Sequence, residues 1–316
     1  MDELVEAICT CERVPALPVV TANILALCND PDVDFDKLAV AVSADPTLEA
    51  KFVQVANSAL FSGGQKVETA DTAIVRMGLK VTRLLVLGFT LEKEVRTRVT
   101  PEFDIERFWR HALTTGADAR AIARAVWPAA RDDTLSVGLL QDIGMVAMEC
   151  ALPKEYAKVM EGRRRDRKAE LPDLELRVFG LTHMEVGSEL VRRWMFPSQI
   201  YLPILYHHRA KGDADLEKLP ADVGNLTRIV RLGATVSRLF HGRDQSVAYK
   251  ELTCAAIGEK HVETEQLEEI LGSVETDVRE ICDLFGVQVR SIRTYEDIKA
   301  AIEQEQETET LQGSHA

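Results

Sequence analysis

The stretch from Thr134 to Cys150 constrains the fold most, because it is almost wholly apolar and yet carries an acid at its centre, Asp142. A lone aspartate buried in such a run costs several kcal/mol unless it is hydrogen-bonded, ion-paired or metal-bound. Gly138 and Gly144 flank it, and each glycine lets another backbone or a ligand come close. We therefore expect residues 134–150 to form one buried helix with a polar site at Asp142.

Apolar residues elsewhere recur at helical rather than strand spacing. Phe35, Leu38 and Val42 share one helical face, and Asp45-Pro46 joins a capping carboxylate to a proline that suits the first helical turn. The N-terminal third shows no strict alternation of apolar and polar residues, which half-buried strands would need. The sequence therefore predicts an all-α protein.

The composition bounds the class of protein. The 316 residues are 46% hydrophobic and 28% charged, with a formal net charge of −13, which argues against a general affinity for nucleic acid or anionic lipid. The six cysteines are scattered without a CxxC pair, which is typical of a reduced cytoplasmic protein. The chain also lacks a leader pattern and a long apolar run, so we expect no membrane association.

Four histidines from separate stretches could converge on Asp142, namely His111, His183 and the neighbours His207 and His208. A water-activating metal needs three or more such ligands plus an open position, and helical bundles build these sites from inward side chains. Each histidine also has a structural interpretation, as a satisfied core residue or as a capping or solvated residue. Adjacent helical residues point about 100° apart, so His207 and His208 need not both face the site.

The order of these residues resembles the HDOD family, the regulatory relatives of HD-type metal phosphohydrolases. The resemblance covers about residues 10–240. Its motifs are Leu17-Pro18, Asp45-Pro46, Val55-Ala-Asn57-Ser58, Thr72-Ala-Ile74…Gly78, Phe108-Trp109-x-His111, Gly138-Leu-Leu-Gln-Asp142-Ile-Gly144, His183-x3-Gly187-x6-Trp194-x2-Pro197 and His207-His208.

The resemblance implies an all-helical HD-like bundle in two packed lobes, in a bacterial cytoplasmic signalling protein. We place the N-terminal lobe at about residues 1–100 and the HD-like lobe at about 101–240. A C-terminal helical extension should follow at about 241–302 and cover one end. The polar, acidic residues 303–316 lack an apolar stripe and are expected to be disordered.

The resemblance also implies a degenerate metal site. HD enzymes hold their metals with a His, a His-Asp pair and a later Asp, often with a Lys three residues after the pair. By position, the first His is His111 and the acid of the pair is Asp142, but the His of the pair is Gln141, the Lys is Met145 and the later Asp is best aligned with Ala234. Further ligands of two-metal relatives match His183, His207 and His208.

With Asp142 as the only remaining anionic ligand, a hard cation such as Mg²⁺ would be poorly held. We therefore expect no metal, no cofactor and no catalysis at the degenerate pocket, whose residues are His111, Gln141, Asp142, His183, His207 and His208. The expected role is signal transduction through contact with other signalling proteins or through sensing a small ligand in that pocket; the oligomeric state is left open. If a metal does bind, the histidines and Asp142 would hold a softer ion such as Zn²⁺ or Fe, which leaves a residual phosphohydrolase as the alternative.

Two further features have competing interpretations. Thr69–Leu91 has the outline of a DNA-binding helix-turn-helix, but its second helix is too apolar to lie in a groove, so nucleic acid is not an expected partner. The basic run Arg163–Lys168 is most simply a solvated helix face, with contact to an anion or an acidic partner as the other interpretation.

Overall fold

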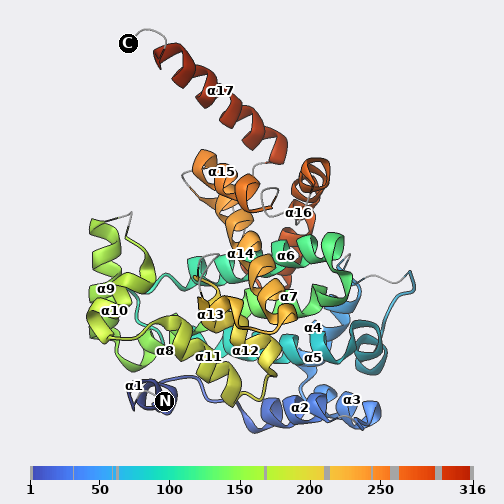
Figure 1. Ribbon diagram of the computed structural model, residues 1–316. Coiled ribbons are helices and arrows are strands. Elements are labelled where there is room, and N and C mark those ends of the chain that lie inside the picture. Colours follow the sequence, from blue (N-terminus) through green and yellow to red (C-terminus); the bar gives the residue numbers. More distant parts are fainter. Residues whose placement is uncertain are drawn as a thin grey trace.

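The structure is a computed structural model that describes residues 3–30, 32–58, 60–61, 64–166, 169–209, 214–242, 245–256, 263–288 and 294–313. Within these ranges every regular element is a helix and no strand occurs, which confirms the predicted all-α class. Figure 1 shows most helices packed into one broad body, from which the last helix projects.

The N-terminal helices follow the predicted start and stop signals. Asp45 accepts hydrogen bonds from the backbone N–H groups of Thr47 and Leu48, so the Asp-Pro pair does begin a helix. Gly78 has a φ of +79°, which lets the chain kink within the Thr69–Leu91 stretch, and residues 81–89 beyond it are all buried. The helices are α1 (Glu3–Cys9), α2 (Val19–Asn29), α3 (Phe35–Ser43), α4 (Pro46–Ala56) and α5 (Ala70–Val95).

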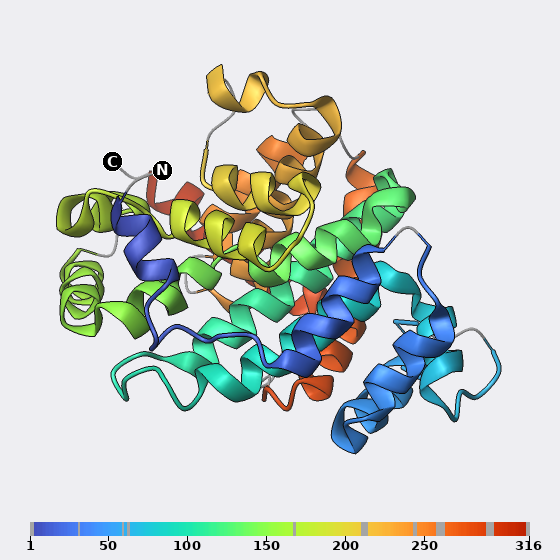
Figure 2. The same ribbon diagram turned by 90° about the horizontal axis from the view of Figure 1, so that it is seen from below.

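The first helix lies apart from the other helices of its third of the chain. Helix α1 packs on α8 (Ile143–Ala151) and α11 (His183–Arg193), and Arg193 forms an ion pair with Glu6. Figure 2, seen from below, shows this short blue helix away from α3 and beside the yellow-green part of the chain. The N-terminal residues therefore lie over the HD-like helices, close to the candidate site.

Close backbone approaches bring the HD-like helices together. A Cβ atom on Gly138 would lie 2.6 Å from the Cα of Gly116, and one on Gly144 would lie 2.0 Å from the carbonyl oxygen of His183. The expected role of the two glycines beside Asp142 is therefore confirmed. The elements are α6 (Ile105–Val126), η1 (Pro128–Ala130), α7 (Arg131–Leu140), α8, α9 (Pro153–Arg165), α10 (Leu171–Phe179), α11, α12 (Ser198–Tyr206), α13 (Ala214–Glu217) and α14 (Ala221–His241).

The C-terminal helices α15 (Gln245–Ala256) and α16 (Thr264–Leu284) pack on α14 and α6, respectively. The backbone N–H of Leu60 donates to a carboxylate oxygen of Glu280 at 2.9 Å, and the rings of Phe285 and Phe89 lie 4.6 Å apart. Helix α16 therefore contacts both the N-terminal helices and the HD-like lobe.

The last helix is α17 (Tyr295–Gly313), and residues 314–316 lie outside the described part of the chain. The expected disorder of residues 303–316 stays a prediction. The first turns of α17 bury Tyr295, Ile298 and Ile302, and this anchored segment is extended by alanine, glutamate and glutamine, which favour helix without needing an apolar stripe.

Candidate metal centre

Asp142 lies at a junction between helices. The stretch 134–150 was expected to be one helix, but it breaks at Gln141 and Asp142, where α7 ends and α8 begins. The backbone N–H of Met145 donates to the carbonyl oxygen of Asp142 at 2.9 Å, which starts the second helix. The break brings the carboxylate of Asp142 within reach of histidines from three other segments. The prediction of one continuous helix is therefore wrong at the residue that defines the site.

The carboxylate is buried but stays charged. Asp142 is only 6% exposed, and burial alone would raise its pKa. Hydrogen bonds from His183 and His207, together with the charge of His111, outweigh burial and hold the pKa of Asp142 well below its ordinary value. The pocket therefore keeps an anion at its centre.

His183 is held by a second buried acid, Glu175, which the sequence did not single out. One oxygen of Glu175 accepts both the backbone N–H of His183, at 2.9 Å, and the imidazole Nδ1, at 2.7 Å. Burial lowers the pKa of His183, but Glu175 and Asp142 outweigh it and raise that pKa to about 10. Because Nδ1–H donates to Glu175, the ring turns Nε2 toward Asp142, 3.4 Å from Oδ1.

His207 is oriented in the same way by the main chain. Its Nδ1 donates to the carbonyl oxygen of Ile204 at 2.7 Å, so its Nε2 faces the pocket and lies 3.4 Å from Asp142 Oδ1. The ring of His208 packs 4.3 Å from that of His207 and 5.2 Å from that of His183, on the exposed side of the group. Both neighbouring histidines therefore contribute, although helical spacing alone left this open.

The ligand atoms form a compact group. Asp142, His183, His207 and His208 each offer one atom, and these atoms all lie within 4.8 Å of one another. Three of them make an equilateral triangle, because the two Nε2 atoms are also 3.4 Å apart. A tetrahedral ion with bonds of about 2.0–2.1 Å has ligand atoms roughly 3.3–3.4 Å apart, so the triangle matches one face of such a site.

His111 and Gln141 lie at the edge of this group. His111 Nε2 is 3.5 Å from Asp142 Oδ2, the oxygen that also accepts from Gln141 Nε2 at 3.3 Å. His111 Nδ1 lies 3.4 Å from the hydroxyl of Ser237 on α14. All six residues of the expected pocket are thus brought together, with His111 and Gln141 on the carboxylate oxygen away from the triangle.

The positions of the two other departures from the HD pattern differ. Met145 packs against the small apolar cluster of Val159, Leu171 and Leu174, so a core side chain stands where the resemblance expects a lysine. Ala234 is half-buried on α14, and the side chain of that helix that reaches the site is Ser237, one turn further along. The alignment of Ala234 with the lost aspartate stays a prediction.

Glu175 could have been found by its place in the pattern. Glu175 belongs to α10, which packs against α9. Glu175 lies on the apolar stripe of α10, between Leu171 and Leu174 on one side and Val178 on the other. A fully buried acid on an apolar stripe signals a partner, as it does for Asp142.

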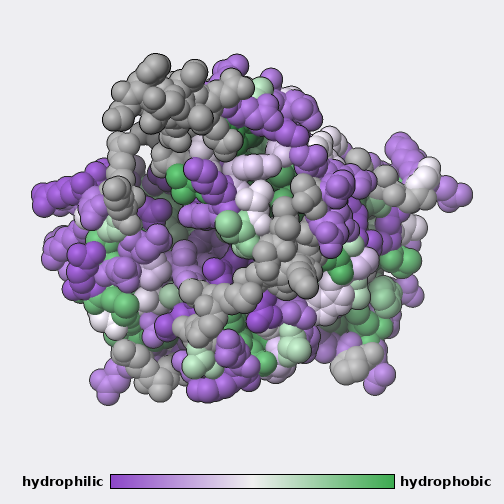
Figure 3. All heavy atoms as spheres, turned by 45° about the horizontal axis from the view of Figure 1, so that its top comes forward, coloured by the Kyte–Doolittle hydropathy of each residue, from purple (hydrophilic) through white to green (hydrophobic). Residues whose placement is uncertain are grey.

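Two other expectations concern the surface. Arg163, Arg164 and Arg165 are exposed in the last turn of α9, as expected of a solvated face, while residues 167 and 168 lie outside the described residues. No helix in the described part of the chain is long and apolar enough to cross a lipid bilayer. Figure 3 shows a mostly hydrophilic face with a hollow near its centre.

Solved structures with the same fold include proteins of several kinds. The chain is 20% identical to a candidate phosphohydrolase from Shewanella amazonensis, with a TM-score of 0.70 over 90% of this chain and 98% of that one. It is 23% identical to an HDOD domain protein from Geobacter sulfurreducens (TM-score 0.63; 86% and 93% covered). It is 19% identical to a candidate signal transduction protein from Marinobacter aquaeolei (TM-score 0.61; 90% and 61% covered). At these identities the likeness shows a shared fold.

Sequence comparison gives the family. An uncharacterized protein of Treponema pallidum is 27% identical over 200 residues, which are 62% of this chain, and the match spans only 38% of that relative's length. The family model for the HDOD domain matches residues 14–210, well over half of the chain and including all six pocket residues. The chain belongs to the HDOD family.

Proposed function

We propose that this protein is a cytoplasmic regulatory HDOD protein that holds one transition-metal ion at Asp142, His183 and His207 and does not turn over phosphoesters. The proposal departs from the expectation of a pocket without metal. The observation that carries it is the triangle of ligand atoms with 3.4 Å sides. Such spacing suits one face of a tetrahedral ion.

The second layer of contacts supports the same ion. Metal-bound histidines commonly donate their other ring N–H to a carboxylate or a backbone carbonyl, which fixes the tautomer. Glu175 does this for His183, and the carbonyl of Ile204 does it for His207. Imidazole-rich sites with a single carboxylate favour Zn²⁺ or Fe²⁺ over Mg²⁺. A bound ion would supply a fixed positive charge that links α8, α11 and α12.

The same residues argue against hydrolysis. Two-metal hydrolases need several anionic ligands, and Asp142 is the one carboxylate in this group. Gln141 is a weak neutral ligand, and Met145 supplies no charge that could face a phosphate. The output would then come from contact with other signalling proteins, in line with the shared fold of the Marinobacter protein.

Metal analysis and calorimetry test the proposal. Purified protein, stripped with a chelator and carrying Cys254→Ser to remove the exposed thiol, should bind about one Zn²⁺ and bind Mg²⁺ far more weakly. His207→Ala or Asp142→Asn should weaken zinc binding at least roughly tenfold. His241→Gln, at a histidine outside the group, should leave it unchanged. Zinc binding that ignores Asp142 and His207 would refute the site.

The alternative, a residual phosphohydrolase, is separated by turnover. Zinc-loaded protein should release no phosphate from phosphomonoesters, nucleotides or cyclic dinucleotides above the rate of His207→Ala. The double variant Gln141→His with Ala234→Asp restores the two missing ligands of the HD pattern and should gain metal affinity. An unchanged affinity would show that Ala234 is the wrong position, whereas wild-type turnover would overturn the regulatory proposal.

A further inference from the structure

Helices α6 and α14 cross tightly at one point and separate beyond it. At the crossing, a Cβ atom on Gly233 would lie 2.7 Å from the backbone nitrogen of Ala119, and the hydroxyls of Thr114 and Ser237 are 2.6 Å apart. The two helices run antiparallel, so the end of α6 lies beside the start of α14. Between these ends lies a cavity of about 300 Å³, at the lower end of the range of small-molecule sites.

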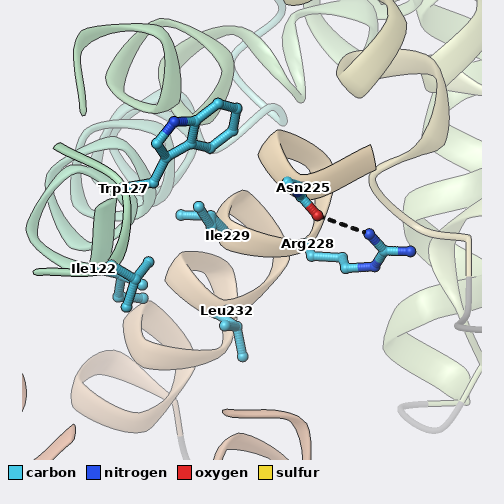
Figure 4. A pocket seen from close by; sticks show the side chains of 7 residues that line it. Ile122, Trp127, Asn225, Arg228, Ile229 and Leu232 are labelled. Atoms are coloured by element: carbon cyan, nitrogen blue, oxygen red, sulfur yellow. Dashed lines mark hydrogen bonds between the residues drawn. The ribbon is translucent and has the colours of Figure 1, made fainter. Parts of the chain in front are cut away.

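The walls of the cavity divide into an apolar and a polar side. Figure 4 shows Ile122, Trp127 and Ile229 on one side, with Leu232 below them and Asn225 and Arg228 on the other. Asn225, Arg228, Ile229 and Leu232 are spaced along one face of α14, so a single helix presents both the apolar floor and the cation.

The guanidinium of Arg228 donates to the amide oxygen of Asn225 at 3.1 Å, and no carboxylate of the described residues pairs with it. Asn225 holds the guanidinium at the rim while leaving most of its N–H donors free, and such a group recognises a carboxylate or phosphate through paired hydrogen bonds.

We propose that this cavity is a binding site for a small amphipathic anion, with an apolar, ring-sized body against Trp127, Ile122 and Ile229 and one acidic group on Arg228. The site is separate from the metal centre and independent of its occupancy. The cavity and the metal centre share two helices, because α6 carries His111 and α14 carries Ser237 at the ends away from the cavity.

Three probes that share a phenylethyl body and differ in their head group test the site: 3-phenylpropionate, 3-phenyl-1-propanol and 3-phenylpropylamine. The protein has three tryptophans, and Trp127→Leu assigns one of the three indole N–H signals in a two-dimensional NMR spectrum. The carboxylate should shift the Trp127 signal and leave those of Trp109 and Trp194, which are buried, in place. It should bind roughly tenfold or more tightly than the alcohol, and the amine should bind most weakly.

Variants assign the two halves of the site. Arg228→Gln should remove the preference for the carboxylate over the alcohol, while Arg238→Gln, on the same helix but paired with Glu251, should keep it. Trp127→Leu should weaken the carboxylate and the alcohol alike. Equal binding of all three probes, a preference that survives Arg228→Gln, or shifts confined to Trp109 or Trp194 would overturn the proposal.

Discussion

Asp142 and Asp118 are both buried aspartates of the HD-like lobe, and they meet the cost of burial in opposite ways. They are 6% and 1% exposed, respectively. Asp142 faces histidines from three segments, and its pKa lies well below the ordinary value. No cation of the described residues pairs with Asp118, and burial together with the nearby Asp277 raises its pKa well above that value. Partners, not depth, therefore decide whether a buried acid of this fold is charged.

The surroundings of Asp118 explain the difference. It lies on α6 under α16, where Arg124 and Arg120 act on Asp277 and Arg124 pairs with that residue at 3.3 Å. One oxygen of Asp118 has no hydrogen-bond partner. The α6–α16 contact therefore contains a carboxyl group whose pKa is raised and one of whose oxygens is unpartnered, while the α8–α11 contact contains a partnered carboxylate whose pKa is lowered.

Disrupting the α8–α11 contact beside Asp142 should have the largest effect on the free energy of unfolding. Gly144→Ala would place a Cβ atom 2.0 Å from the carbonyl oxygen of His183, so α8 and α11 must separate and Asp142 loses its partner. We expect a loss of about 4 kcal/mol in the free energy of unfolding, measured by urea denaturation. Gly272→Ala is the matched control: nothing lies within 4 Å of that site, and the helix should gain up to about 1 kcal/mol. Equal effects of the two alanines would contradict the close approach.

Removing His183 takes one of its histidine partners from Asp142. In zinc-free protein, His183→Leu leaves Asp142 and Glu175 buried without their shared partner and should cost about 3 kcal/mol. Glu175→Leu in the same chain should recover part of that loss, because one of the stranded carboxylates is gone. Unfolding free energies of the two single variants and the double variant measure this coupling, and simple additivity would show that Glu175 does not act through His183.

The sequence predicts the local features of the two contacts better than the packing between distant segments. Helical spacing, the Asp45-Pro46 start and the paired glycines beside Asp142 are local signals, and the structure follows them. Asp142 itself could be singled out because no other residue of its type interrupts so apolar a run. The all-α class and the central acid were therefore accessible from the residues themselves, whereas the six-residue pocket is what the resemblance to the HDOD family implies.

The rest depends on contacts between distant segments. The helix break at Gln141 and Asp142 is stabilised by histidines that lie roughly 40 to 65 positions further along the chain. No local helix propensity encodes such contacts. Asp118 was overlooked because Ala117-Asp118-Ala119-Arg120 looks like an ordinary charged helix until α16 covers it. Glu175 differs from Asp118, because its place on the apolar stripe of α10 was a local signal that could have been used. The burial of Asp118 can be recognised only when the covering helix is known.

The smallest effect should come from neutralising Asp118. The change in the free energy of unfolding should be opposite in sign to that of neutralising Asp142. A raised pKa means that the fold binds a proton the unfolded chain releases, so the stability from this group is present below the ordinary value of 3.8 and is lost as pH rises toward the folded pKa. Asp118→Asn keeps the shape without the titration. We expect the Asp118→Asn variant to gain roughly 1 kcal/mol in the free energy of unfolding over wild type at pH 8 and nothing at pH 4, as measured by denaturation at both pH values.

Asp142→Asn is the matched comparison. The lowered pKa of the Asp142 carboxylate stabilises the fold above the ordinary value of 3.8, so this variant should instead lose stability at pH 8. If both asparagines moved the free energy of unfolding in the same direction, the two aspartates would not differ in charge, and the contrast between the two contacts would fail.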